Sequence, residues 1–81
     1  MQTNEKRHQQ LRHLETVVRV KEAHVNDLCA QALEHARFAN ELHSQEHAMR
    51  AQRLRESIRC WESKIAKNRE EIARLKDGIT D

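Results

Sequence analysis

The 81-residue sequence contains one glycine, no proline and only two aromatic side chains, Phe38 and Trp61. Apolar residues make up 37% of the chain and charged residues 35%, which is too little apolar volume to fill a sandwich, a barrel or a sheet covered by helices. A chain of this length also lies near the lower limit for one independent core. The composition is instead typical of long helices and coiled coils, so we predict an all-α fold.

Motifs that support catalysis are missing as well. The sequence has no glycine-rich phosphate-binding loop and no nucleophile at a defined spacing from a base. The sequence also indicates no concave scaffold that would exclude water from a reaction. We therefore predict a protein that is not an enzyme and that carries no cofactor.

Long apolar runs and paired cysteines are absent too. No segment approaches the roughly 18–20 apolar residues of a membrane span. Residues 1–5 contain no apolar run that could serve as a signal peptide. Cys29 and Cys60 belong to no CxxC pair, which favours two reduced thiols over a disulfide scaffold. We expect a cytoplasmic protein without a membrane span.

The sequence does contain an almost uninterrupted helical signal. Between Thr3 and Asp77 there is no glycine or proline to break a helix. Thr3 or Asn4 is placed to cap the N-terminus, and Gly78 is the predicted left-handed residue after the last turn, with Ile79 folding back on that turn. Because helices in water are stabilised mainly by packing, the apolar stripe must meet another chain or another part of its own chain.

Apolar residues at alternating spacings of three and four form two heptad seams, whose apolar members are the predicted oligomerisation core. The first seam, within residues 4–42, has the apolar members Leu11, Leu14, Val18, Val25, Leu28, Ala32, Ala39 and Leu42. The second seam, within residues 51–79, has the apolar members Ala51, Leu54, Ile58, Trp61, Ile65, Ile72, Leu75 and Ile79. Such seams wind into left-handed supercoils. Cys29 and Cys60 are predicted to flank them as small apolar fillers.

The two seams are out of phase, so the chain changes direction or helical face between them. The intervening residues 43–50 are polar but include no strong helix breaker. They form either a turn, in which Ser44 caps a second helix, or a solvent-facing stretch of one long helix. The fold is therefore an extended antiparallel dimer of long helices, or a helical hairpin that forms a four-helix bundle.

Antiparallel packing of the first seam on the second is favoured by the polar members of the seams. A parallel homodimer would set Lys21 against its own copy and His35 against its own copy, and like charges in a core are costly. An antiparallel alignment that leaves residues 43–50 outside instead pairs Leu42 with Ala51 and Lys21 with Ile72. The prediction is a coiled coil in which the N-terminal half packs on the C-terminal half.

The net charge of +2 comes from the second half of the chain. Residues 1–42 carry six basic and six acidic side chains, whereas residues 43–81 carry nine and seven. The basic residues concentrate in residues 50–69, and a candidate surface for an acidic partner consists of Arg50, Arg53, Arg55 and Arg59. With so few aromatic residues for stacking on bases, a solvated basic face is the favoured interpretation, and nucleic-acid binding through residues 50–69 is the alternative.

Six histidines raise two further hypotheses. His43 and His47 are four positions apart and could bind a divalent ion, although exposed histidines on a polar helix face are the favoured interpretation. His35 lies on the first seam, where its protonation near pH 6 would loosen the packing unless the ring stays hydrated at the margin. Phe38 lies off the seam and indicates a second contact surface.

These features together predict a non-catalytic, self-associating coiled-coil module for protein–protein interaction. The pattern is a general one, and it resembles helical hairpins of secretion-system stalks and chaperones, tethering segments and cytoskeletal adaptors. A scaffold, an adaptor or a small helical chaperone is therefore the expected type. The expected partners are a second copy of the chain and another protein. A nucleic-acid-binding helical dimer that uses residues 50–69 is the alternative function.

Overall fold

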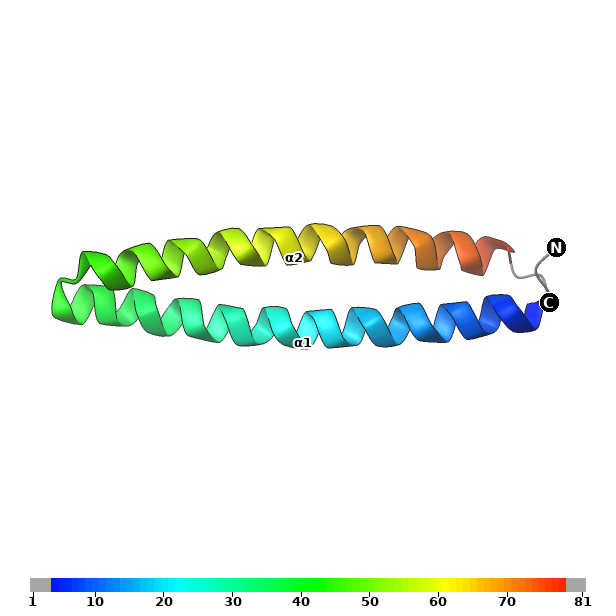
Figure 1. Ribbon diagram of the computed structural model, residues 1–81, viewed down its shortest axis with the longest axis horizontal. Coiled ribbons are helices and arrows are strands. Elements are labelled where there is room, and N and C mark those ends of the chain that lie inside the picture. The colour runs from blue at the N-terminus through cyan, green and yellow to red at the C-terminus, as the bar shows by residue number, and fades with distance from the viewer. Residues whose placement is uncertain (1–3, 79–81) are drawn as a thin grey trace.

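A computed structural model describes residues 4–78 as a helical hairpin (Figure 1). Helix α1 runs over Asn4–Leu42, with 39 residues, and helix α2 over Gln45–Gly78, with 34 residues. The two helices lie antiparallel along their whole length, in a rod of 59 × 15 × 14 Å measured over Cα atoms (Figure 1). The all-α prediction is confirmed, and the N-terminal half packs on the C-terminal half within one chain.

The chain reverses within two residues, His43 and Ser44. His43 has a φ of 48°, which places it in the left-handed region. The Ser44 N–H donates to the carbonyl oxygen of Ala39 at 3.1 Å. This six-to-one hydrogen bond across a left-handed residue is the Schellman pattern that ends many helices. Histidine is among the residues that adopt this conformation more readily than most, so α1 can end here without a glycine.

Ser44 also begins the second helix. Its hydroxyl oxygen accepts a hydrogen bond from the backbone N–H of His47 at 3.3 Å, and its carbonyl oxygen accepts one from Ala48 at 3.3 Å. A serine that accepts from the third helical residue is a standard N-cap and satisfies one of the free N–H groups of the first turn. Of the two alternatives for residues 43–50, the turn capped by Ser44 is therefore the one found.

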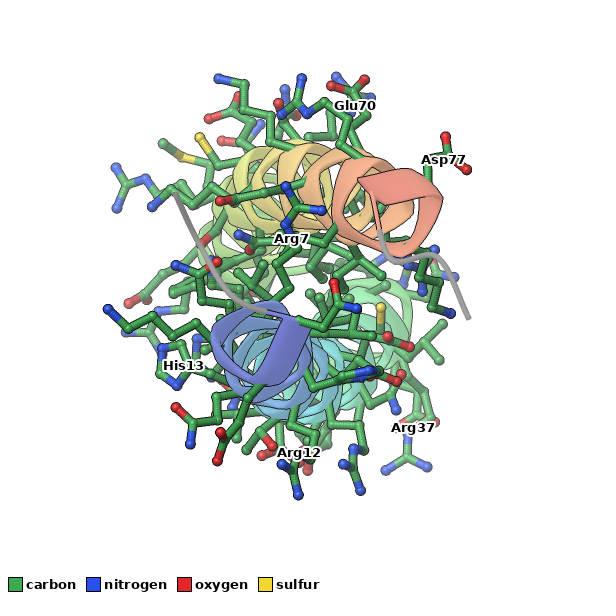
Figure 2. The ribbon with its side chains drawn as sticks, turned by 90° about the vertical axis from the view of Figure 1, so that its right-hand side faces the viewer. Arg7, Arg12, His13, Arg37, Glu70 and Asp77 are labelled. Carbon is green, nitrogen blue, oxygen red and sulfur yellow. The ribbon has the colours of Figure 1, made fainter. Side chains whose placement is uncertain are left out.

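Arg7 joins the two free ends of the hairpin. Its Nη1 donates to the carbonyl oxygen of Gly78, and Figure 2 shows its side chain lying between the two helices. The prediction of a left-handed Gly78 is wrong, because this residue is the last of α2 and has no positive φ. A cation that binds the last carbonyl satisfies the helix end in place of a left-handed cap. The predictions for Thr3 and Ile79 lie outside the described residues.

The heptad seams meet along the interface of α1 and α2. Six of the described residues are buried, namely Val18, Leu28, Ala32, Ala51, Ile58 and Ile65. Further seam members are half-buried, namely Leu11, Leu14, Val25, Ala39, Leu54, Trp61, Ile72 and Leu75. Leu42 differs from them, because it ends α1 at the turn and its side chain is 63% exposed. The core is thus a single narrow layer between two helices.

The predicted register along this layer is wrong, because contacts across the hairpin join residues that lie nearer the turn than the predicted partners. Lys21 was expected to face Ile72, but its Nζ donates to Oδ1 of Asn68 at 2.7 Å. The prediction left residues 43–50 outside the paired helices, whereas α2 already begins at Gln45. Because the turn is only two residues long, every pair in the hairpin shifts toward it.

Candidate association surface

The two sides of the helix interface differ in the side chains that cover it. We call one the groove side, where His24 of α1 meets Trp61 of α2. The centres of these two rings are 5.0 Å apart and their planes are inclined by 77°, an edge-to-face contact. Lys64 covers the same indole, with its Nζ 4.7 Å from the ring centre. Trp61 therefore stands between the core and the surface, and its ring forms part of both.

Beside Trp61 lies an open groove of about 550 Å³. We call it the Trp61 groove, and its lining residues are His13, Thr16, Val17, Val20, Lys21, His24 and Trp61. Most of its wall is apolar, and none of these residues is acidic. Val20 is 65% exposed although it belongs to this apolar wall. The groove is therefore a small, mainly apolar hollow at the surface beside the indole.

The opposite side, which we call the ion-pair side, is closed by charges. Arg69 Nη2 of α2 lies 3.0 Å from Glu22 Oε1 of α1, which joins the helices across their interface. Glu22 and His24 are two positions apart, so they project about 200° apart around α1 and contact α2 on different sides. The hollow on this side measures about 340 Å³ and is lined in part by Glu22, Glu62 and Arg69.

Two polar layers interrupt the apolar interface. Lys21 and Asn68 form the first through the 2.7 Å hydrogen bond. The carbonyl oxygen of the amide accepts from the ammonium, which keeps the charge of Lys21 partnered in a half-buried position. Lys21 and Asn68 are polar members of the two seams, so their meeting fixes the register of the hairpin.

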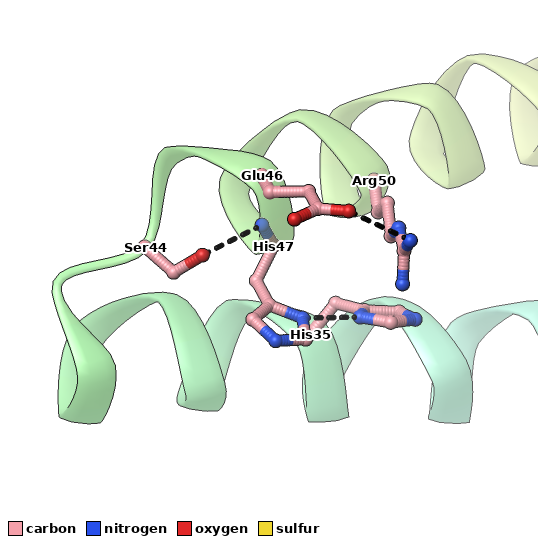
Figure 3. A network of polar contacts seen from close by, with 5 residues as sticks. All are labelled: His35, Ser44, Glu46, His47 and Arg50. Atoms are coloured by element: carbon pink, nitrogen blue, oxygen red, sulfur yellow. Dashed lines mark hydrogen bonds and ion pairs between the residues drawn. The ribbon is translucent and has the colours of Figure 1, made fainter.

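The second polar layer, near the turn, consists of His35 and His47. Their Nδ1 atoms are 3.0 Å apart, and their ring centres are 5.2 Å apart (Figure 3). The distance between the ring centres exceeds the distance between the Nδ1 atoms by close to twice the radius of an imidazole ring. The two nitrogens therefore lie nearly on the line that joins the ring centres. Lone pairs that face each other in this way can share a proton, whereas metal ligation needs them to converge on a third point. The layer is therefore an N–H···N hydrogen bond.

The contact between His35 and His47 also shows where the histidines of the sequence hypotheses lie. His47, which the disfavoured metal hypothesis joined with His43, turns its ring toward His35, and His43 occupies the exposed left-handed position of the turn. Within residues 4–78 no three histidine, cysteine or acidic side chains gather closely enough to hold a metal ion. Phe38, expected on a second contact surface, packs on His47 with ring centres 5.5 Å apart. Its ring thus helps to close the turn end of the hairpin.

The four arginines of the candidate basic surface spread around α2. Arg50 Nη2 is paired with Glu46 Oε1 at 2.9 Å (Figure 3), while Arg53, Arg55 and Arg59 are exposed. Arg53 and Arg55 project about 200° apart around the helix, so they do not form one ladder along a single face. Nucleic-acid binding through residues 50–69 stays a prediction.

The two cysteines lie in different surroundings. Cys29 is half-buried and packs against the cluster of Leu28, Ala32 and Ile58, as a small apolar filler does. Cys60 is exposed, so the prediction that it flanks the seam as a filler is wrong. Both thiols are free.

Sequence reasoning missed the Trp61 groove because Val17 and Val20 lie outside the first seam. The signal was nevertheless present in the crowding of Val17, Val18 and Val20 within four positions. Three apolar residues this close cannot all face a narrow stripe of period 3.5, so at least one must extend the apolar face sideways. The wider face is the one that includes His24 and, across the interface, Trp61.

Comparisons of the chain with protein-family models, with curated proteins and with solved structures find no match. Neither α1 nor α2 has an apolar stretch long enough to cross a membrane.

Proposed function

We propose that the chain is a non-catalytic, self-associating helical hairpin that serves protein–protein interaction. The observation that carries the proposal is the excess of exposed surface. The hairpin exposes 6462 Å², whereas a compact monomer of this mass exposes about 5,100 Å². The excess of about 1,400 Å² is larger than the roughly 800 Å² that each partner buries in a standard protein–protein interface. A second molecule on the surface would remove most of it.

The thin core supports the same proposal. Two helices bury only one layer of side chains between them, and the six buried residues are all of moderate size or small. Stable helical bundles of this kind usually enclose their core with four helices, which two copies of a hairpin supply. Self-association would bury the apolar atoms that one hairpin leaves in water and would thereby stabilise both copies.

The module would act as a scaffold, an adaptor or a small helical chaperone, with its charged outer faces presented to another protein. Figure 2 shows side chains such as Arg12 and Glu70 pointing outward from α1 and α2, away from the helix interface. We also propose the cytoplasm as its location, because two free thiols are compatible with a reducing compartment.

Sedimentation equilibrium, combined with far-UV circular dichroism, tests the proposal. At micromolar concentrations we expect a strongly helical species with at least twice the mass of the chain, in equilibrium with the hairpin at lower concentration. A helical monomer at every concentration up to about 200 μM would contradict the proposal. A dissociation constant above that value would mean a free energy of association weaker than about 5 kcal/mol.

Nucleic-acid binding through residues 50–69 remains the alternative function, supported by the exposure of Arg53, Arg55 and Arg59. Retention on DNA or RNA at about 50 mM salt, with most of the affinity lost by about 200 mM, would favour it, because binding to phosphates releases counterions. Absence of retention at low salt would remove this alternative.

A further inference from the structure

We infer that a second copy of this chain docks on the Trp61 groove, in a two-fold symmetric contact made mainly by the α1 helices of the two copies. The inference rests on the proposed self-association and specifies the surface that makes it. Apart from Trp61, every residue that lines the groove belongs to α1. A partner seated in the groove therefore lies along α1 and touches α2 only at the indole.

The groove and its edge suit a self-complementary contact. Val20 lines the groove and is 65% exposed, so it can enter a hollow of another molecule. In a two-fold contact the same patch faces itself, and Val20 of each copy meets the groove of the other. Each copy thus supplies both the projecting apolar side chain and the hollow that receives it, with Val17 and Trp61 as the walls.

The charge distribution favours α1 as the helix at the contact. Residues 1–42 hold equal numbers of basic and acidic side chains, so two α1 helices approach without net repulsion. A contact between two α2 helices would instead bring together two copies of the basic residues 50–69. The two lysines near the groove have neutral partners, Asn68 and the Trp61 ring, so each keeps its charge, and a docked copy must leave both ammonium groups in contact with water.

The other sides of the hairpin are less suitable for burial. On the ion-pair side a docked copy would have to cover the Glu22–Arg69 pair, whose side chains are 45% and 61% exposed, and pay for removing water from both charges. Leu33 is a second apolar side chain that is accessible, with 73% of its surface exposed. The hollow beside it is lined by the charged residues Glu34 and Arg37, so a partner there would have to cover charges as well. Figure 2 shows Arg37 and His13, which lines the Trp61 groove, pointing from opposite sides of α1.

Sedimentation equilibrium on two matched variants tests the inference. Val20→Lys places a charge in the groove, and Leu33→Lys places the same charge at an equally exposed apolar position about 140° away around α1. Because both side chains face water in the hairpin, neither substitution should lower the helicity of the monomer. We expect Val20→Lys to raise the dissociation constant at least tenfold and Leu33→Lys to leave it within about twofold. Val20→Ser, which adds no charge, should raise it about threefold.

The outcomes separate this inference from the proposed function. If the unmodified chain is monomeric at every concentration, self-association and the docking surface both fail. If the unmodified chain dimerises and Val20→Lys and Val20→Ser dimerise equally well, the docking surface is wrong while self-association stands. A selective loss of association in Leu33→Lys would likewise overturn the assignment and move the contact to the opposite side of α1.

Discussion

The two sides of the α1–α2 interface are built on the same pair of seams yet end in opposite chemistry. On the ion-pair side, Arg69 and Glu22 join the helices through charges 3.0 Å apart. On the groove side, His24 and Trp61 join them through an edge-to-face contact of two rings. The first arrangement places charged groups at the surface, whereas the second leaves an apolar groove beside the indole. A hairpin can therefore present hydrated, mutually satisfied charges on one side and an apolar hollow on the other.

The difference arises from which residue types flank the seams. An acidic residue on one helix and a basic residue on the other satisfy each other and remain hydrated, so that side gains little from further burial. Apolar and aromatic residues such as Val17, Val20 and Trp61 gain from leaving water, and the hairpin alone buries them incompletely. We therefore expect a second copy to gain more free energy by covering the groove side than by covering the ion-pair side.

The largest effect on the groove side is expected from removing the indole of Trp61. Trp61→Ala should lower the unfolding free energy by about 2 kcal/mol, roughly half the cost at a fully buried site, because Trp61 is half-buried. It should also weaken self-association, since the groove loses a wall. Urea denaturation measures the first effect. Leu33→Ala, at a position that is 73% exposed, is the control and should cost less than about 0.5 kcal/mol. Equal losses in the two variants would show that the groove side is not special.

The turn offers a change that should leave both sides of the interface untouched. His43 adopts a φ of 48°, a conformation that costs a residue with a side chain about 1–2 kcal/mol and glycine almost nothing. His43→Gly should raise the unfolding free energy by about 1 kcal/mol without altering self-association. Chemical denaturation and sedimentation equilibrium check the two parts. A lower midpoint would indicate that the His43 side chain stabilises the turn through contacts.

The smallest effect is expected on the ion-pair side. Glu22→Gln removes the partner of Arg69 while keeping the size of the side chain, and exposed pairs of this kind contribute about 0.2–1 kcal/mol. We expect a loss of about 0.5 kcal/mol at low salt that shrinks as salt is added, with no change in association. A loss in association comparable to that of Val20→Lys would contradict the distinction between the two sides.

The overall fold could be predicted because it depends on periodicity. The seams through Val18 and Leu28 and through Ile58 and Ile65 could be read at spacings of three and four, and these residues are the buried ones. The register could not be obtained from the same pattern, because any two heptad seams can be aligned antiparallel in several ways. The pairing of polar members would have given it, since Lys21 and Asn68 satisfy each other.

The candidate site was harder to predict than the fold. The groove depends on residues just outside the seam, such as Val17 and Val20, and their crowding beside Val18 shows that the apolar face is wider than the seam but not which residue of the other helix lies beside it. The pairing of His35 with His47 depends on where the chain turns, and a turn that uses His43 instead of glycine carries a weak sequence signal. The contact of Phe38 with His47 depends on the turn as well, and the second contact surface at Phe38 stays a prediction.

Trp61 allows the most direct test, because it is the single tryptophan of the chain and forms a wall of the groove. Its emission maximum and its quenching by acrylamide can be followed over the same concentration range as the mass from sedimentation. Docking of a second copy on the groove predicts that emission shifts to shorter wavelength and quenching declines, with the midpoint at which the mass doubles. A doubling of mass with unchanged emission and quenching of Trp61 would contradict the account.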